Sequence, residues 1–165
     1  FGVDSCAEAE ALVSVGDPLV LEVAEVVELP HRRLSSRALD NRVGAYVLLD
    51  VLDTLLATPV AATVHLCVTT REELGLPLAP SATLAHHLAL DGAVVLDATM
   101  ASSVPAFPVA RWHRAPLGGG PVLGRGGPTA WGLTESLRAV AASEDIPHFL
   151  QALGGASATD VDALS

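Results

Sequence analysis

The sequence has 165 residues, of which 50% are hydrophobic and 17% are charged, and its formal net charge is -10. This length, with a mean hydropathy of +0.46, provides enough apolar side chains for one folded domain, which excludes the disordered and fibrous classes. The negative charge repels nucleic-acid backbones and anionic membrane surfaces, so we expect no nucleic acid and no membrane as a partner.

The predicted compartment follows from the cysteines and from the interrupted apolar stretches. Cys6 and Cys67 lie far apart and match no Cys-x-x-Cys metal or redox spacing, so a reducing, cytoplasmic location is the simplest interpretation. Acidic residues leave no segment of about 18 uncharged apolar residues that could span a membrane. These residues are Asp50, Asp53, Asp91 and Asp97.

The first predicted structural segment is β-rich and covers residues 17–29. Apolar and acidic residues alternate there, which is typical of strands with one solvent-exposed face. The polar and basic residues 30–37 that follow are the best candidate for a domain boundary, which we place at Leu34. Residues 1–34 and 35–165 are therefore predicted to belong to different domains.

The rest of the chain alternates predicted helices and strands. Apolar residues recur at helical spacing over residues 43–56, before Pro59. The Gly- and Pro-rich residues 102–128 contain no phosphate-loop motif and are predicted to form an irregular connection. Shorter patterns predict helices over 80–90 and 129–143 and strands over 61–69, 93–96 and 148–153. This alternation predicts an α/β fold, a layered sheet with helices on both faces.

Acidic side chains stand at the ends of the predicted elements. Asp40 precedes the first helix of this second region, and Asp97 ends a predicted strand. Glu72 and Glu73 follow another strand closely. Carboxylates at the carboxyl ends of successive strands converge on one edge of an α/β sheet, where such sheets bind ligands. Oxygen ligands suit zinc, cobalt or manganese, and two such ions about 3.5–4 Å apart can share one carboxylate.

The pattern alone leaves two interpretations of these residues open. In a metal site, one of the adjacent glutamates, Glu72 and Glu73, could hold a metal while the other takes a proton from the metal's water. Adjacent glutamates are also frequent at helix N-termini, where they complement the helix dipole. Asp40 and Asp97 could likewise cap a helix and a turn.

Around these residues the sequence resembles the tetrahedral or glutamyl aminopeptidase family of two-metal exopeptidases, in which a smaller β-rich domain interrupts the catalytic domain. The matching motifs, in chain order, are VSVGDPLVL, ALDNRVGAYVLLDVL, TTREELGL, VVLDAT, LGGGPVL and IPHF. The resemblance implies that residues 1–34 are the end of the β-rich insertion and assembly domain. Residues 35–165 are then the central part of the catalytic α/β domain.

The resemblance also implies a role for each acidic residue. Asp40 would bridge two divalent metal ions, zinc or cobalt. Glu73 would ligate one of these ions and Asp97 the other, while Glu72 would be the general base. The peptide bond between Asp40 and Asn41 would be cis, and Asn41 stands where many relatives have a second Asp.

The family's site also uses a histidine from a His-x-Asp segment and another from near the C-terminus, and this sequence contains neither segment. We therefore expect the chain to be part of a longer protein and to bind metal weakly by itself. The histidines that are present match no ligand motif. Surface or capping roles are expected for His31, His86, His87, His113 and His148.

These observations together predict a two-metal aminopeptidase that acts on short peptides. Because the family forms tetrahedral shells, we expect a homo-oligomer, up to a dodecamer. The alternative is a catalytically inactive remnant that serves as an assembly or interaction module, and metal content distinguishes the two. Glycoside hydrolysis is disfavoured because 4% aromatic residues are too few for a sugar-binding set.

Overall fold

The computed structural model describes residues 2–20, 22, 26–75, 80–106 and 113–165. The chain divides into two compact units, Phe1–Ala38 and Leu39–Ser165. Leu34, the predicted end of the first domain, lies inside strand β2 (Arg33–Ser35) of the first unit.

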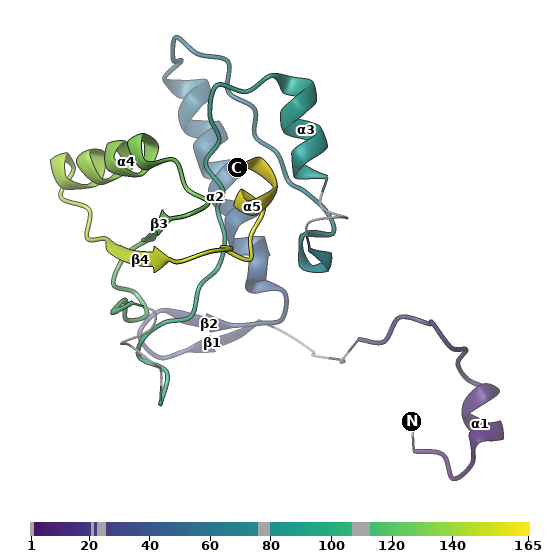
Figure 1. Ribbon diagram of the computed structural model, residues 1–165. Helices are drawn as coiled ribbons and strands as arrows, with labels where there is room; N and C mark the ends of the chain where they lie inside the picture. The colour runs from purple at the N-terminus through teal and green to yellow at the C-terminus, as the bar shows by residue number, and fades with distance from the viewer. Residues whose placement is uncertain (1, 21, 23–25, 76–79, 107–112) are drawn as a thin grey trace. The chain divides into compact units, whose positions relative to one another are not determined.

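The first unit contains the short helix α1 (Cys6–Glu10) and a hairpin of β1 (Val27–Leu29) and β2 (Figure 1). The antiparallel register pairs Val27 with Ser35. The prediction of strand over 17–29 is therefore too long, because among its described residues only Val27–Leu29 form a strand. Alternating apolar and acidic residues are compatible with a strand, but a strand also needs a neighbouring strand to pair with. Strand β2 pairs with only three residues of this segment.

Helix α2 (Leu39–Ala57) confirms the helix that the sequence predicts over 43–56. Asp40 (φ -85°, ψ 110°) and Asn41 (φ -117°, ψ 48°) are not helical, so the regular helix begins after them. Its last turn is closed by a hydrogen bond from Thr58 N to Thr54 O (2.9 Å), and Pro59 cannot continue it. No helix in the described part of the chain is both long and apolar enough to cross a membrane.

The second unit contains two parallel strands, β3 (Val122–Gly126) and β4 (Phe149–Leu153), with Val122 opposite Phe149. Helix α4 (Trp131–Ser143) connects them and packs against β3 (Figure 1). A connecting helix is the usual crossover between parallel strands. Helix α4 and strand β4 confirm the predictions for residues 129–143 and 148–153. The prediction of an irregular connection over 102–128 is wrong at β3.

Glycines explain why β3 escaped prediction. Gly120 (φ 120°) and Gly126 (φ 147°) have backbone conformations that L side chains rarely adopt. A Cβ atom at these positions would collide with the carbonyl oxygens of Pro147 and Leu153 respectively. Glycines here let the segments of β3 and β4 approach closely, so a composition typical of a loop belongs to a paired strand.

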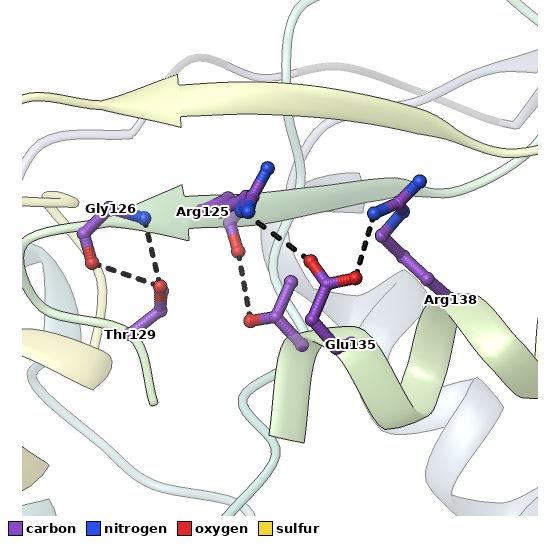
Figure 2. A network of polar contacts seen from close by, with 7 residues as sticks. Arg125, Gly126, Thr129, Glu135 and Arg138 are labelled. Atoms are coloured by element: carbon purple, nitrogen blue, oxygen red, sulfur yellow. Dashed lines mark hydrogen bonds and ion pairs between the residues drawn. The ribbon is translucent and has the colours of Figure 1, made fainter. Parts of the chain in front are cut away.

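Polar contacts between α4 and β3 set how the helix lies on the strand. Figure 2 shows Glu135 between two arginines: Arg138 Nη1 donates to Oε2 at 2.8 Å, and Arg125 Nε lies 3.5 Å from Oε1. Thr134 Oγ1 also donates to Gly124 O at 3.4 Å. Partly exposed ion pairs contribute at most about 1 kcal/mol each, so this network orients α4 more than it stabilises the fold.

The strands predicted over 61–69 and 93–96 are wrong. Both ranges are described, and neither pairs with another strand. Their β-branched side chains are far from buried, since Val64 is 47% and Val94 54% exposed. Such residues favour extended backbone, but they form a strand only where a neighbour supplies hydrogen bonds and packing. Helix α3 (Ser81–Leu88), in contrast, confirms the helix predicted over 80–90.

The described residues thus form a mixed α/β fold, as the alternation of patterns predicts. Its strands form two sheets of two strands each. Buried apolar side chains are few in the described part of the chain, where Ala115 and Ala141 are the core residues below one-tenth exposure. The short elements η1 (Glu72–Leu74) and α5 (Val161–Leu164) complete the second unit and carry residues of the site described next.

Candidate active site

The predicted site residues come from separate segments of the second unit. Asp40 lies at the start of α2, before the regular helix begins. Glu72 and Glu73 open the single turn of 3-10 helix η1, where Glu72 is half-buried and Glu73 exposed. Asp97 is exposed and follows the extended residues 93–96.

Asn41 connects the segments that carry Asp40 and Asp97. Its Nδ2 donates a hydrogen bond to Leu96 O (2.6 Å), and its Oδ1 accepts one from Gly44 N (2.9 Å), which caps the regular part of α2. A Cβ atom at Gly44 would lie 2.5 Å from Asn41 Oδ1. The bond between Asp40 and Asn41 is cis, as the resemblance implies. The hydrogen bond therefore holds Leu96, which precedes Asp97, next to Asn41, which follows Asp40.

The surroundings of Glu72 favour its neutral form. Burial raises the pKa of Glu72, and the charges of Asp97, Glu73, Asp160 and Asp40 raise it further, in that order. A carboxylate with a raised pKa is better able to take up a proton near neutral pH and to give it back. This is the property that a general base with a second role as acid requires.

Asp97 is affected by the same charges. Burial raises its pKa, a hydrogen bond from Ala98 N (2.7 Å) lowers it, and the charges of Asp40, Glu73 and Asp160 raise it, so that the pKa lies above its ordinary value. The charges of Asp40 and Glu73 thus raise the pKa of both Glu72 and Asp97.

Asp160 is the member of this cluster that the sequence analysis missed. Its Oδ2 accepts a hydrogen bond from Thr69 Oγ1 (2.7 Å), and its Oδ1 accepts one from Ser81 Oγ (2.9 Å). The signal available in the sequence was its position directly before the short apolar run VDAL, which suggests a helix cap. The structure shows no capping hydrogen bond from its side chain, which binds two distant hydroxyl groups instead.

A cavity of about 240 Å³ lies beside the two glutamates. Glu72 and Glu73 line it on one side, and residues 158–163, with Asp160 and Asp162, line it on the other. Asp40 and Asp97 are not among its lining residues. Because the described residues around it include carboxylates and no Lys, Arg or His, the cavity has a negative potential.

The donor chemistry of this cluster suits a divalent metal ion. Carboxylates are common ligands of zinc and of harder cations. The pKa values of Glu72 and Asp97 are raised by burial and by neighbouring negative charge, and a cation would offset that charge. In the part of the chain that the structure describes, however, no three His, Cys, Asp or Glu side chains come close enough together to hold a metal ion. The residues thus fit a metal in their chemistry, without closing a coordination sphere.

His113 differs from the expected surface position, because it is 4% exposed. Its Nδ1 accepts a hydrogen bond from Ala115 N (3.2 Å), and its Nε2 lies 3.4 Å from Thr99 Oγ1. Since Nδ1 is an acceptor, the proton of the neutral ring is assigned to Nε2, which then donates to Thr99. His113 therefore packs against the segment that follows Asp97.

Asp162 fixes the loop that forms one wall of the cavity. Its carboxylate accepts hydrogen bonds from Ser157 N (2.7 Å), Ser157 Oγ (2.8 Å) and Ala158 N (2.9 Å). Burial raises the pKa of Asp162, but these hydrogen bonds outweigh burial, and the pKa lies below its ordinary value. The ionised carboxylate therefore stabilises this loop.

We expect Asp162→Asn to lower the free energy of unfolding by about 1–3 kcal/mol at pH 7, because an amide nitrogen cannot accept the bonds that one carboxylate oxygen accepts. A folded-state pKa below the unfolded one stabilises the fold above the unfolded pKa, and this contribution disappears as the pH falls through the folded pKa. Urea unfolding should therefore show the difference between wild type and variant shrinking below about pH 4. A difference that stays constant on acidification would contradict the assignment, and the exposed Asp53→Asn is the matched control.

Comparison with known proteins gives one family match. A protein-family model described as M42 glutamyl aminopeptidase matches residues 1–165. No solved structure matches the chain. The family match spans the motifs around Asp40, Glu72 and Asp97 that carry the resemblance in the sequence, and it covers the whole range in which the acidic cluster lies. The chain therefore belongs to the M42 glutamyl aminopeptidase family, and so to the peptidases, which hydrolyse peptide bonds.

Proposed function

We propose that this chain is the central part of a two-metal aminopeptidase that removes N-terminal residues from short peptides. The observation that carries the proposal is the position of Glu72, half-buried, beside a cavity, with a pKa raised by burial and by surrounding carboxylates. Membership of a peptidase family gives this arrangement its reaction class.

In the proposed site, Asp40 would hold both metal ions, Glu73 would hold one of them and Asp97 would hold the other. When bound, zinc or cobalt would polarise the peptide carbonyl and lower the pKa of a water molecule. The hydrogen bond from Asn41 to Leu96 supports this assignment, because it connects the segments of Asp40 and Asp97. The charges of Asp40 and Glu73 also raise the pKa of Asp97, as expected of carboxylates grouped around two neighbouring cations.

Glu72 moves the proton. A carboxylate oxygen of Glu72 takes a proton from the attacking water molecule. At the same time, the oxygen of that water molecule bonds to the carbonyl carbon of the first peptide bond. Glu72 then gives this proton to the amine nitrogen as the carbon–nitrogen bond breaks. The raised pKa favours the first transfer, because the carboxylate of a less acidic group is a stronger base toward the proton of the water molecule.

The test uses full-length protein and the hydrolysis of leucine- and glutamate-anilides. We expect turnover that stops after chelation and returns on addition of zinc or cobalt. Turnover that survives complete removal of metal would contradict the two-metal proposal. A metal-loaded protein that hydrolyses neither anilide nor any short peptide would favour the inactive assembly module.

Gly44→Ala tests the connection between Asp40 and Asp97. The new Cβ displaces the Asn41 side chain, which costs about 1 kcal/mol for each of two hydrogen bonds, while alanine in a helix returns up to about 1 kcal/mol. We expect turnover to fall about tenfold or more, because misplaced ligands are costly, with a loss of unfolding free energy of only about 1 kcal/mol. The control is Gly132→Ala in α4, where a Cβ meets nothing within 4 Å, and which should leave turnover unchanged.

We also propose that the protein is cytoplasmic and forms a homo-oligomer, in which residues 1–34 contribute to subunit contacts and residues 35–165 belong to a layered catalytic domain. Exposed apolar side chains in the first unit support a role of residues 1–34 in subunit contacts, since Leu19 is 69% and Val20 76% exposed. Analytical ultracentrifugation of full-length protein should show an assembly of up to twelve subunits. A monomer at every concentration would contradict self-association.

A further inference from the structure

Asp160 connects two segments that lie on either side of the glutamates in sequence. Thr69 precedes Glu72 by three residues, and Ser81 begins helix α3 after them. Each of the two carboxylate oxygens of Asp160 accepts one hydroxyl hydrogen bond, at 2.7 Å from Thr69 Oγ1 and at 2.9 Å from Ser81 Oγ. One side chain from the far end of the chain therefore joins both flanks of the segment that carries Glu72.

The environment of these bonds makes them strong. Ser81 is 4% exposed, so water competes little for its hydroxyl group, and Thr69 and Asp160 are half-buried. Hydrogen bonds to an ionised carboxylate are about twice as strong as those between neutral groups. Helices α3 and α5 also contact each other, which keeps Asp160 next to the start of α3.

The turn that carries Glu72 has little internal support. It is a single turn of 3-10 helix, closed by bonds from Leu74 N to Arg71 O (3.2 Å) and from Gly75 N to Glu72 O (2.9 Å). Arg71 before it and Gly75 after it both have positive φ, at 64° and 78°. A turn this short depends on contacts outside itself to keep one orientation.

We propose that Asp160 is a positioning residue, which fixes the turn that carries Glu72 and Glu73 by binding Thr69 and Ser81. The inference rests on the proposed function, since Glu72 is the general base only if the protein is an aminopeptidase. The shared cavity supports it, because Asp160 lines that cavity together with both glutamates. The charge of Asp160 also contributes to the raised pKa of Glu72.

The test compares variants of full-length, metal-loaded protein that remove the bridge in different ways. Asp160→Ala removes both acceptors, and the double variant Thr69→Val, Ser81→Ala removes both donors while it keeps the carboxylate. Asp160→Asn keeps one acceptor oxygen and replaces the other with an NH₂ donor. Because hydroxyl groups can both donate and accept, the asparagine can retain its hydrogen bonds with Thr69 and Ser81. Asp53→Ala, on the exposed side of α2, is the control for loss of a carboxylate elsewhere.

We expect Asp160→Ala and the double variant each to lower kcat by about 10- to 100-fold with KM changed by less than about threefold, because displacement of a reacting group by about 1 Å has this effect. Amide hydrogen exchange in peptides that contain residues 69–75 should become faster in both variants, with exchange in α4 unchanged. Asp160→Asn should retain most of the activity and protection, and Asp53→Ala all of it.

Two results would overturn the inference. One is wild-type kcat and exchange in Asp160→Ala, and the other is faster exchange throughout α4 as well, which would show general unfolding. If the wild-type protein hydrolyses no peptide, the proposed function fails instead. In that case faster exchange confined to residues 69–75 would still show the bridge, without a role in catalysis.

Discussion

Glu72→Gln should lower kcat by about 100- to 10,000-fold and leave the bound metal in place. Glutamine keeps the size of the side chain and part of its hydrogen bonding, but it cannot take a proton from water. The structure gives Glu72 a half-buried position beside the cavity and a raised pKa, both of which suit a group that accepts a proton. Stopped assays with a leucine-anilide, together with elemental analysis of the purified protein, measure both effects.

The matched control for this variant is Glu144→Gln, which changes an exposed glutamate at the end of α4 and should leave turnover and metal content unchanged. Loss of one metal equivalent in Glu72→Gln would show that Glu72 is a ligand. Retention of full turnover would remove Glu72 from the mechanism.

Glu73→Gln should give the opposite result, with loss of one metal ion as the primary defect. Substitution of a residue that only supports a ligand costs about 10- to 100-fold in metal affinity, so loss of the ligand itself should cost at least as much. Glu73 is exposed and lines the cavity, and its charge raises the pKa of both Glu72 and Asp97.

Calorimetric titration with zinc measures this prediction directly. We expect two sites of high affinity in the full-length wild-type protein and one in full-length Glu73→Gln, with partial recovery of turnover at high zinc concentration. Two sites of unchanged affinity in Glu73→Gln, with turnover reduced as in a base variant, would show that the roles of Glu72 and Glu73 are exchanged.

The helices could be predicted from the sequence because their signals are local. Apolar spacing and Pro59 define α2, and similar patterns define α3 and α4. Strands were harder, because pairing depends on segments far apart in sequence. The β-branched residues 61–69 pair with no strand among the described residues, whereas the glycine-rich β3 pairs with β4 through close backbone contact.

In the site, too, residues next to local motifs could be predicted, whereas a residue that depends on distant contacts could not. Asp40, Glu72, Glu73 and Asp97 stand next to recognisable motifs, and the structure places them within electrostatic reach of one another. Asp160 could not be assigned, because its partners are hydroxyl groups 91 and 79 residues away in sequence. Such contacts depend on how α3 and α5 pack, which no local pattern encodes.

Removal of residues from the N-terminus of short peptides can be tested with two forms of one pentapeptide. Full-length, metal-loaded protein is incubated with the peptide bearing a free amine and with the same peptide acetylated at its N-terminus, and mass spectrometry follows the products. We expect the peptide with a free amine to lose residues one after another from its N-terminus, and the acetylated peptide to remain intact. Cleavage of both forms at an internal bond, or of neither, would contradict this expectation.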